Sequence, residues 1–361
     1  MRLTCLWLRD FRNYHDLELK LVPAGLTLVL GDNGEGKTNL LEAIAYLATL
    51  SSFRRAPREA LVRRGADRAI IRAEGEDSAR RLLIEAELNQ TGRDRVLVNR
   101  AQLRQARELL GTLRVTVFSP DDLEIVKGGP AGRRKYLDDL LVALRPRNQA
   151  LRADVERILR QRGALLRQAG GRLTPDVAST LDVWDQALAD KGGSLTAARE
   201  ALVSRLEPET AKAYDQVAAG GEIRMVYERS WGSDFGSELA AARAEDIRSG
   251  VTTLGPHRDD LALGIAGLPA RTHASQGEQR SLALALRLAS HTLVADETST
   301  PPVLLLDDVF SELDPQRSRA LVAHLPPGQS VLTSAGDPPP GLVPARRVRV
   351  RGGTIEECVD E

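Results

Sequence analysis

The fold class is decided by one stretch of the sequence, Gly31-Asp32-Asn33-Gly34-Glu35-Gly36-Lys37-Thr38, which matches the pattern G-x-x-x-x-G-K-[ST] without a mismatch. An apolar run at residues 26–30 precedes it, and apolar side chains at helical spacing follow it between residues 40 and 47. A buried strand, a glycine-rich turn and an amphipathic helix form the setting that a phosphate-binding loop requires. The stretch therefore predicts an α/β fold.

Each residue type in this motif suits one task in nucleotide binding. Glycines let backbone N–H groups wrap the α- and β-phosphates, and the N-terminus of the following helix adds its positive dipole end. We expect Lys37 to reach the β- and γ-phosphates and the Thr38 hydroxyl to bind Mg²⁺. The predicted cofactors are ATP and Mg²⁺, and the predicted ATP-binding residues are Gly31, Asp32, Asn33, Gly34, Glu35, Gly36, Lys37 and Thr38.

A second apolar run, residues 303–306, ends in the two carboxylates Asp307 and Asp308. We expect Asp307 to join Thr38 on the metal side of the site, and Asp308 to orient or deprotonate the attacking water. The predicted catalytic residues are therefore Lys37, Asp307 and Asp308. Asp307 lies 269 residues after Thr38, which is far more than a compact phosphate-loop fold needs.

The long gap between the two motifs predicts an inserted domain. Residues 70–99 and 115–118 have the pattern of short strands, whereas residues 133–245 are rich in Ala, Leu, Arg and Glu and have the pattern of about four helices. Strand-like character returns near Val251. We therefore expect a phosphate-loop domain built from residues 1–128 and 251–361, with a mostly α-helical insert at residues 129–250.

Composition excludes several classes of protein. Fifty Lys and Arg balance fifty Asp and Glu, which excludes a uniformly basic nucleic-acid coat and an acidic tail protein. Aromatic residues are only 4%, which argues against single-strand binding on aromatic platforms. Cys5 and Cys358 are expected to be reduced thiols. With no signal peptide and no run near the roughly 18 apolar residues of a membrane span, we expect a cytoplasmic protein with no membrane partner.

A third motif, Ser275-Gln276-Gly277-Glu278-Gln279-Arg280, opens an apolar helical pattern. A capping box, with Ser275 as N-cap and Glu278 three residues later, would explain it structurally. However, an ABC-type ATPase carries its signature Ser-x-Gly-x-Gln at this distance before its carboxylate strand. Ser311-Glu312-Leu313-Asp314 then stands where such enzymes have the D-loop. With four motifs in this order, the chain resembles the head of an SMC-like ABC ATPase.

Further motifs narrow the resemblance to the RecF family of bacterial recombination and repair proteins. They cover nearly the whole chain and comprise Asp10-Phe11-Arg12-Asn13-Tyr14, Gly128-Gly129-Pro130, Arg133-Arg134-Lys135-Tyr136-Leu137-Asp138, Gly255-Pro256-His257-Arg258-Asp259-Asp260-Leu261 and Leu306-Asp307-Asp308-Val309-Phe310-Ser311-Glu312-Leu313-Asp314. By this resemblance Arg12 and Asn13 would line the nucleotide pocket, although a role in the turn is equally open. The role of His257 stays open.

The resemblance implies a two-lobed ATPase with a short helical arm that forms a homodimer with ATP. Two nucleotides would be sandwiched between residues 31–38 of one subunit and the signature residues Ser275, Gln276, Gly277 and Glu278 of the other, with Ser311 and Asp314 in the D-loop. It also implies binding to DNA at gaps and junctions. Partners would be RecO, RecR and RecA, in loading of RecA, DNA replication and repair and the SOS response.

Three departures from typical ABC ATPases predict slow hydrolysis, as in a timer rather than a motor. Asp308 stands where the family of enzymes has Glu, and Thr333-Ser334 where it has a switch His. No Gln follows residues 115–118, although Asp121 or Asp122 could stand nearby. We therefore expect a weak, DNA-dependent ATPase that acts as a clamp.

The zero net charge hides local surpluses. Residues 54–107 hold 14 Arg against 8 Asp and Glu, and residues 133–172 hold 11 Arg and Lys against 4. Solvated faces in an Arg-rich chain would explain these counts, and so would a DNA surface that contacts phosphates with weak sequence preference.

Three other classes of nucleotide-binding protein fit the sequence less well. The nucleotide-binding subunit of an ABC transporter is the main alternative, but the long insert fits it poorly. A GTPase lacks support because no N-K-x-D motif is present, and the insert is too short for the coiled coil of a structural SMC protein.

Overall fold

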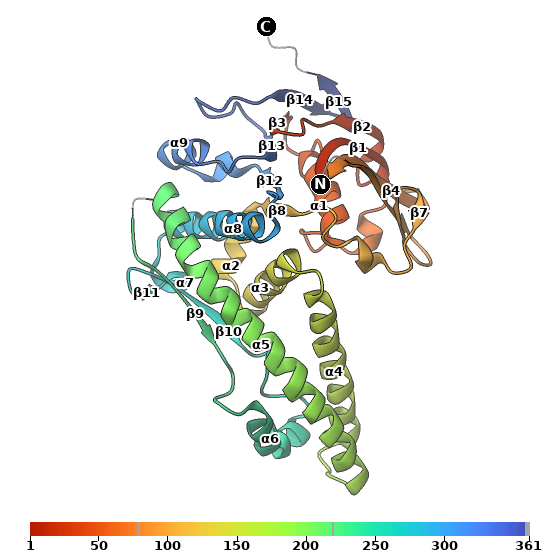
Figure 1. Cartoon of the computed structure of the whole chain (residues 1–361), viewed down its shortest axis with the longest axis vertical. Helices are drawn as coiled ribbons and strands as arrows, with labels where there is room; N and C mark the ends of the chain where they lie inside the picture. Colours follow the sequence, from red (N-terminus) through yellow and green to blue (C-terminus); the bar gives the residue numbers. More distant parts are fainter. Residues whose placement is uncertain (78–79, 219, 358–361) are drawn as a thin grey trace. The chain divides into compact units, whose positions relative to one another are not determined.

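A computed structural model describes residues 1–77, 80–218 and 220–357 (Figure 1). Cys358 therefore lies outside the described residues. Cys5 is a buried free thiol, and burial raises its pKa to about 11. Of the two thiols predicted to be reduced, the structure therefore describes only Cys5.

The chain divides into two compact units. Unit 1 comprises Met1–Leu123, Lys212–Gly220 and Gln276–Glu361, and unit 2 comprises Glu124–Ala211 and Gly221–Ser275. This division differs from the predicted segments 1–128, 129–250 and 251–361, because residues 251–275 stay with unit 2. The reason is a strand pair, since β10 (Asp260–Ile265) hydrogen-bonds along its length to β9 (Ile223–Glu228).

One sheet of unit 1 is antiparallel throughout. Its order is β2-β1-β4-β5-β6-β7, and β4 and β5 alternate between buried residues on one face and more exposed residues on the other. The hairpin expected within residues 70–99 corresponds to β4, β5 and β6. The strands are β1 (Arg2–Phe11), β2 (Tyr14–Lys20), β4 (Arg68–Asp77), β5 (Arg80–Asn89), β6 (Arg95–Val98) and β7 (Ala101–Gln102).

The other sheet of unit 1 is mostly parallel and carries the predicted phosphate loop. Its order is β15-β14-β3-β13-β12-β8, and only the β14–β15 pair is antiparallel (Figure 1). The carboxyl ends of parallel strands meet at one edge, which is where α/β proteins bind ligands. The strands are β3 (Gly25–Leu30), β8 (Val115–Phe118), β12 (Val303–Asp307), β13 (Gln329–Ser334), β14 (Arg346–Arg351) and β15 (Thr354–Glu357).

Helix α1 (Lys37–Thr49) fills the space between the two sheets of unit 1. Its residues Leu40, Leu41 and Ile44 are fully buried, in one apolar cluster with residues of β1, β4, β5, β12 and β13. The phosphate loop is therefore anchored at both ends by the core. The remaining elements of unit 1 are α8 (Gln276–Thr298), α9 (Pro315–Ala323), η1 (Arg58–Ala60), η2 (Ala106–Leu109), η3 (Pro120–Asp122) and η4 (Val309–Glu312).

Unit 2 is mostly helical, as expected, but it also holds a small antiparallel sheet of order β11-β10-β9. Strand β9 lies inside the insert that we expected to be mostly helical, at a place where the sequence analysis identified no strand. Its residues alternate between buried and exposed faces, a strand signal that six residues are too few to make prominent. The other elements are α2 (Leu123–Lys127), α3 (Pro130–Leu144), α4 (Asn148–Ala169), α5 (Pro175–Val217), α6 (Phe235–Ser249), α7 (Ala270–His273) and β11 (Leu268–Pro269).

Buried polar networks hold unit 2 together. The guanidinium of Arg162 is fully buried and contacts carboxylate oxygens of Asp185 and Asp246, each at 2.7 Å. A second hub is the fully buried Asp259, whose carboxylate accepts hydrogen bonds from Thr196, Tyr227 and Ser230. Asp259 belongs to the motif at residues 255–261, which therefore has a structural task in this unit. His257 in the same motif contacts the Thr252 carbonyl oxygen.

We expect Arg162→Ala to lower the free energy of unfolding by about 3–5 kcal/mol, because it leaves the fully buried Asp246 without its cation and Asp185 with Arg243 alone. Urea unfolding monitored by circular dichroism measures this change. The matched control is Arg157→Ala on the same helix, whose exposed pair with Asp154 should contribute less than about 1 kcal/mol. Equal losses in the two variants would contradict the assignment.

Candidate nucleotide-binding site

The phosphate loop has backbone angles that require glycine at its end. Gly36 has φ of 106° and Gly34 has φ of 90°, in the left-handed region where side chains are strained. A Cβ at Gly36 would also lie 2.5 Å from Nδ2 of Asn13. The motif glycines are therefore needed for the close approach of neighbouring groups and for the turn into α1.

Lys37 begins α1 and turns its side chain back into the loop. Its Nζ donates to the carbonyl oxygens of Gly31 at 2.7 Å and Asp32 at 2.9 Å, and the residue is only 7% exposed. The ammonium group thus lies within the loop that would surround the phosphate groups of a nucleotide. An anion entering the loop would offer it charged oxygens in place of neutral carbonyls.

Thr38 and Asp307 are brought together although 269 residues separate them. The Thr38 hydroxyl donates to Oδ1 of Asp307 at 2.9 Å, and the Thr333 hydroxyl donates to the same oxygen at 2.8 Å. A cavity of about 310 Å³ opens beside them. It is lined by Asn33, Gly34, Gly36, Lys37, Thr38, Asn39, Arg54, Asp307 and Asp308.

The two carboxylates at the end of β12 differ in environment. Burial raises the pKa of the Asp307 carboxyl above its usual range, while hydrogen bonds from Thr333 and Thr38 act in the opposite direction. Asp308 adjoins it with backbone φ of 47°, a left-handed conformation that is strained for a residue with a side chain. Such strain is common at functional sites, and here it lets Asp308 line the cavity instead of continuing the strand.

The residues at this edge fit a magnesium ion that binds together with a nucleotide. Thr38 and Asp307 offer hydroxyl and carboxylate oxygens, the ligands that Mg²⁺ prefers, and phosphate oxygens and water would complete its shell. Oδ2 of Asp307 accepts no hydrogen bond from any residue that the structure describes. Within the same residues, no group of three or more His, Cys, Asp or Glu could hold a metal without such help.

Arg12 and Asn13 have structural tasks and also line a second cavity. The Arg12 guanidinium donates twice to Glu42 at 2.7 Å and once to the Ala60 carbonyl oxygen, and Glu42 is fully buried. Asn13 donates to the carbonyl oxygen of Glu35 within the phosphate loop at 2.9 Å. The second cavity, of about 620 Å³, shares Asn39 and Arg54 with the first; it is lined by Arg12, Asn13, Asn39, Arg54, Glu59, Ala60, Val62, Arg64, Gly65 and Gln90.

Arg54 is the residue that the sequence analysis missed. It lines both cavities, and its Nη1 donates to Oδ1 of Asn39 at 3.2 Å. Arg54 is thus the second cationic side chain, after Lys37, in the lining of the first cavity. Its only sequence signal is its place shortly after α1, which does not distinguish it from the many other arginines of this chain.

The predicted signature residues occupy the start of α8. Gln276, Gly277 and Glu278 form its first turn, and Ser275 is the last residue of unit 2. A Cβ at Gly277 would lie 2.8 Å from Nη1 of Arg317, so the Arg317 guanidinium packs closely against this turn. None of the four lines the two cavities just described.

The predicted D-loop connects to Asp308 through the backbone. The Ser311 hydroxyl donates to the carbonyl oxygen of Asp308 at 2.8 Å. Asp314 caps α9, accepting from the Arg317 backbone N–H at 2.9 Å and from its guanidinium at 2.5 Å.

Asp121 and Asp122, which the sequence left as candidates to stand near the metal site, do not line the cavity. Asp122 turns toward α8, where it accepts from Nη2 of Arg287 at 2.5 Å, and its other oxygen accepts from the Ser119 N–H in a capping box. Asp121 is exposed. Thr333, which replaces the switch His, instead lies directly beside Asp307.

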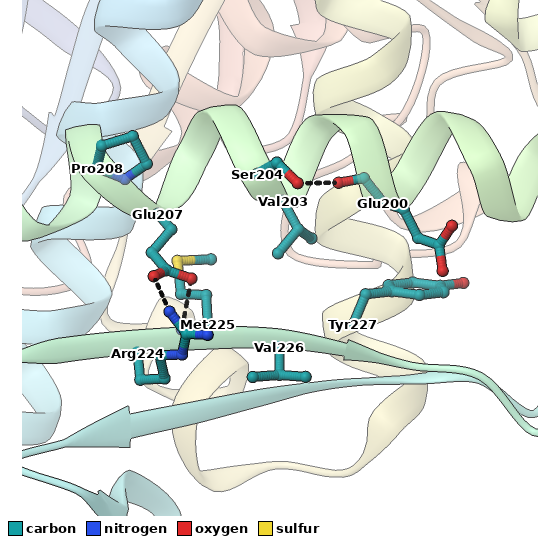
Figure 2. Close-up of a pocket in the computed structure, with 9 residues that line it drawn as sticks. All are labelled: Glu200, Val203, Ser204, Glu207, Pro208, Arg224, Met225, Val226 and Tyr227. Carbon is teal, nitrogen blue, oxygen red and sulfur yellow. Dashed lines mark hydrogen bonds and ion pairs between the residues drawn. The ribbon is translucent and has the colours of Figure 1, made fainter.

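A further cavity, of about 460 Å³, lies in unit 2 between α5 and β9 (Figure 2). Its charged groups already have partners, because Glu207 and Arg224 point toward one another at 2.8 Å and Glu200 pairs with Arg229. This leaves no uncompensated cation for a phosphate group. The candidate nucleotide site is therefore the pair of cavities in unit 1.

Comparison with known proteins decides the family. The model of the RecF/RecN/SMC N terminal domain matches residues 2–330. The DNA replication and repair protein RecF of Streptomyces avermitilis is 45% identical over 99% of this chain and 100% of that protein. The RecF of Frankia alni is 46% identical over 98% and 99%. The chain belongs to the RecF family.

Solved structures agree with this membership of the RecF family. The recombination mediator protein RecF with ATP, in the RecFOR pathway, is 28% identical with a TM-score of 0.92, over 99% of this chain and 98% of that one. An Smc head bound to the C-winged helix domain of ScpA is 17% identical with a TM-score of 0.60, over 99% and 96%, and shows the fold alone. The predicted mixed α/β ATPase-head fold with a helical insertion is confirmed. Among the described residues, no helix is long and apolar enough to cross a membrane.

Proposed function

We propose that this RecF-family chain binds ATP and Mg²⁺ in unit 1, dimerises on ATP, hydrolyses it slowly and clamps DNA during replication and recombinational repair. The observation that carries the proposal is the meeting of Thr38 and Asp307, with Lys37 inside the phosphate loop, at one edge of a parallel sheet. A relative of known structure, whose name includes RecF and ATP, supports the choice of nucleotide.

The residue roles follow from the geometry. Lys37 would exchange its two backbone carbonyl partners for β- and γ-phosphate oxygens. Thr38 and Asp307 would hold Mg²⁺, which neutralises charge on the phosphate oxygens. The nucleoside would occupy the second cavity, beside Arg12 and Asn13, because the two cavities share part of their lining.

Slow hydrolysis follows from the small number of groups that can orient the attacking water. Asp308 is the one carboxylate beside Asp307 in the cavity lining, and its side chain is one methylene shorter than that of Glu. Asp122 is occupied by Arg287 and by its capping box. The Thr333 hydroxyl already donates its hydrogen bond to Asp307, so it cannot also donate one to the water. We infer that ATP stays bound for a long time before it is hydrolysed, which suits a clamp or timer.

ATP-dependent dimerisation is supported by where the signature residues lie. Ser275, Gln276, Gly277 and Glu278 do not line the two cavities described above, so a contact with a nucleotide would be with one held by a second copy. The first turn of α8 offers backbone N–H groups to an anion. In the proposed dimer each nucleotide contacts the phosphate loop of one subunit and the signature of the other.

The arginines along the antiparallel sheet of unit 1 differ in whether a carboxylate neutralises them. On β4 and β5, Arg68 pairs with Glu87 at 2.9 Å and Arg72 pairs with Glu85 at 2.5 Å, so their charges are compensated. In contrast, within the described residues, five exposed arginines along β6, β7 and η2 have no carboxylate partner. They are Arg93, Arg95, Arg100, Arg104 and Arg107.

We call these five residues the arginine edge and propose that it contacts DNA phosphates. The only acid within its span, Asp94, is paired with Arg58. Asn99 and Arg100 have φ of 49° and 69°, a tight turn that projects Arg100 from the end of the hairpin. Unpaired guanidinium groups on an exposed strand edge suit the regularly spaced phosphates of a nucleic acid.

The surplus at residues 133–172 supports DNA binding less well than its count implied. Much of its positive charge is used inside unit 2, in pairs with acids or backbone carbonyls. The residues engaged in this way are Arg133, Arg134, Arg152, Arg157 and Arg162. We therefore assign DNA contact to the arginine edge of unit 1.

Partners are proposed from the names of the relatives. The solved RecF structure is described within the RecFOR pathway, so we propose that this chain acts with RecO and RecR, in the cytoplasm. Loading of RecA at gapped or junction DNA and support of the SOS response complete the proposal.

We expect Lys37→Ala to weaken ATP binding by about 10- to 100-fold, because the phosphates lose a charge-assisted hydrogen-bond donor. Fluorescence titration with a labelled ATP analogue measures the affinity. Lys20→Ala, an exposed lysine on β2, is the control and should bind as the wild type does. An unchanged ATP affinity in Lys37→Ala would refute the site.

Asp308→Asn should retain ATP binding and lose at least about tenfold in the rate of ATP hydrolysis.

The signature assignment predicts that Ser275→Arg binds ATP with normal affinity yet stays monomeric. A long cation at this position would obstruct the approach of a second nucleotide-bound copy. Multi-angle light scattering with and without ATP reports the mass. Ser179→Arg, an exposed serine on α5, serves as the matched control and should still dimerise. ATP-induced dimers of Ser275→Arg would be incompatible with a trans signature.

The arginine edge predicts a change in salt dependence. In Arg100→Ala/Arg104→Ala, the slope of log affinity against log salt concentration should fall by about 2, since two phosphate contacts are lost. Fluorescence anisotropy on gapped duplex DNA with ATP and Mg²⁺, at several salt concentrations, gives the slope. The control Arg72→Ala/Glu85→Ala removes one compensated pair and keeps the net charge. If both variants behave like the wild type, DNA binds elsewhere.

A further inference from the structure

One residue next to the proposed metal site has contacts that its position in the chain did not indicate. Thr333 is the penultimate residue of β13 and is fully buried, and it pairs in register with Asp307 on the neighbouring parallel strand β12. Its hydroxyl donates to Oδ1 of Asp307 at 2.8 Å and accepts from the backbone N–H of Asp308 at 3.0 Å. One hydroxyl therefore contacts both residues of the carboxylate pair.

The first contact determines which oxygen of Asp307 is free. Thr38, which precedes Asp307 in the sequence, and Thr333, which follows it, both donate to Oδ1. No described residue donates a hydrogen bond to Oδ2. Rotation of the carboxylate would weaken both hydrogen bonds, so the two hydroxyls favour one orientation of the Asp307 side chain. Its second oxygen would then remain for the metal, because Asp307 also lines the cavity.

The second contact holds Asp308 in its strained backbone conformation. The Asp308 N–H points at both the carbonyl oxygen of Thr333, at 3.2 Å, and the Thr333 hydroxyl, at 3.0 Å. A left-handed aspartate persists only where its surroundings hold it. The side chain of Asp308 lines the cavity because of this backbone turn.

We propose that Thr333 is a positioning residue for the metal and the water, in which one hydroxyl orients Asp307 and stabilises the backbone of Asp308. This inference rests on the proposed ATP and Mg²⁺ site and assigns a task to the position where typical ABC ATPases have a histidine. A threonine cannot sense the γ-phosphate as a long side chain could. It instead keeps the two carboxylates in a fixed arrangement.

The same sheet provides a matched comparison for a structural role. Thr27 on β3 is also fully buried, in a strand that pairs with β13, and its hydroxyl has no hydrogen-bond partner among the described residues. Replacing either threonine by valine keeps the β-branched shape and removes one hydroxyl. Any general effect of that replacement on the sheet should therefore appear in both variants, whereas an effect on the metal should appear only at Thr333.

The experiment measures how much Mg²⁺ the full-length protein needs to bind a labelled ATP analogue. In Thr333→Val and Thr333→Ala we expect the half-saturating Mg²⁺ concentration to rise by about 10- to 100-fold, the usual effect of removing a group that orients a metal ligand. Affinity for the analogue in EDTA should not change. Thr333→Ser keeps the hydroxyl and should restore the wild-type requirement, and Thr27→Val should match the wild type.

Two results would overturn the inference. One is a hydroxyl-free Thr333 variant that keeps the wild-type Tm and the wild-type Mg²⁺ requirement. The other is a Thr333→Ser variant that needs as much Mg²⁺ as Thr333→Val, since the hydroxyl would then not be the active group. If the wild type itself fails to bind the analogue, the proposed function is overturned and this inference with it. Wild-type binding that Lys37→Ala weakens, together with unchanged Thr333 variants, overturns the inference alone.

Discussion

The hydrogen bond from Thr38 to Asp307 connects two parts of the chain that are 269 residues apart. It exists because β3 and β12 are parallel strands of one sheet, with β13 between them, so that their carboxyl ends reach the same edge. Everything inserted between those strands, including the whole of unit 2, has to leave and return without disturbing that edge. The buried helix α1 and the apolar strands around it provide the rigidity that this arrangement needs.

Charge is used in two different ways in a chain whose net charge is zero. In unit 2, arginines are buried with carboxylates, as in the pair of Arg199 with Asp138 at 2.7 Å. In unit 1, the arginine edge keeps its charge exposed and uncompensated within the described residues. A count of charges along the sequence cannot separate these uses, because pairing depends on partners that are far away in the chain.

The parts of the site that the sequence predicted are those with local causes. The phosphate loop needs glycines at fixed positions and a helix directly after it, and both conditions are written within residues 31–47. Asp307 was predictable because an apolar strand ends at it. Arg54, Thr333 and the pairing of Asp122 with Arg287 were not, since each depends on tertiary neighbours. Strand β9 was missed for a similar reason, because its partner β10 begins more than thirty residues later.

Dimerisation would change how many arginines of this neutral chain contact one DNA molecule. The five residues of one arginine edge would neutralise only a few phosphates, which would give weak binding at physiological salt. Two copies joined through their nucleotides would present two arginine edges to one duplex, and the second contact would then be intramolecular. Because the electrostatic part of the affinity grows with the number of phosphates neutralised, doubling that number raises the affinity far more than twofold. ATP would thus control DNA affinity without changing a single residue of the DNA surface, and slow hydrolysis would set how long the clamp stays closed.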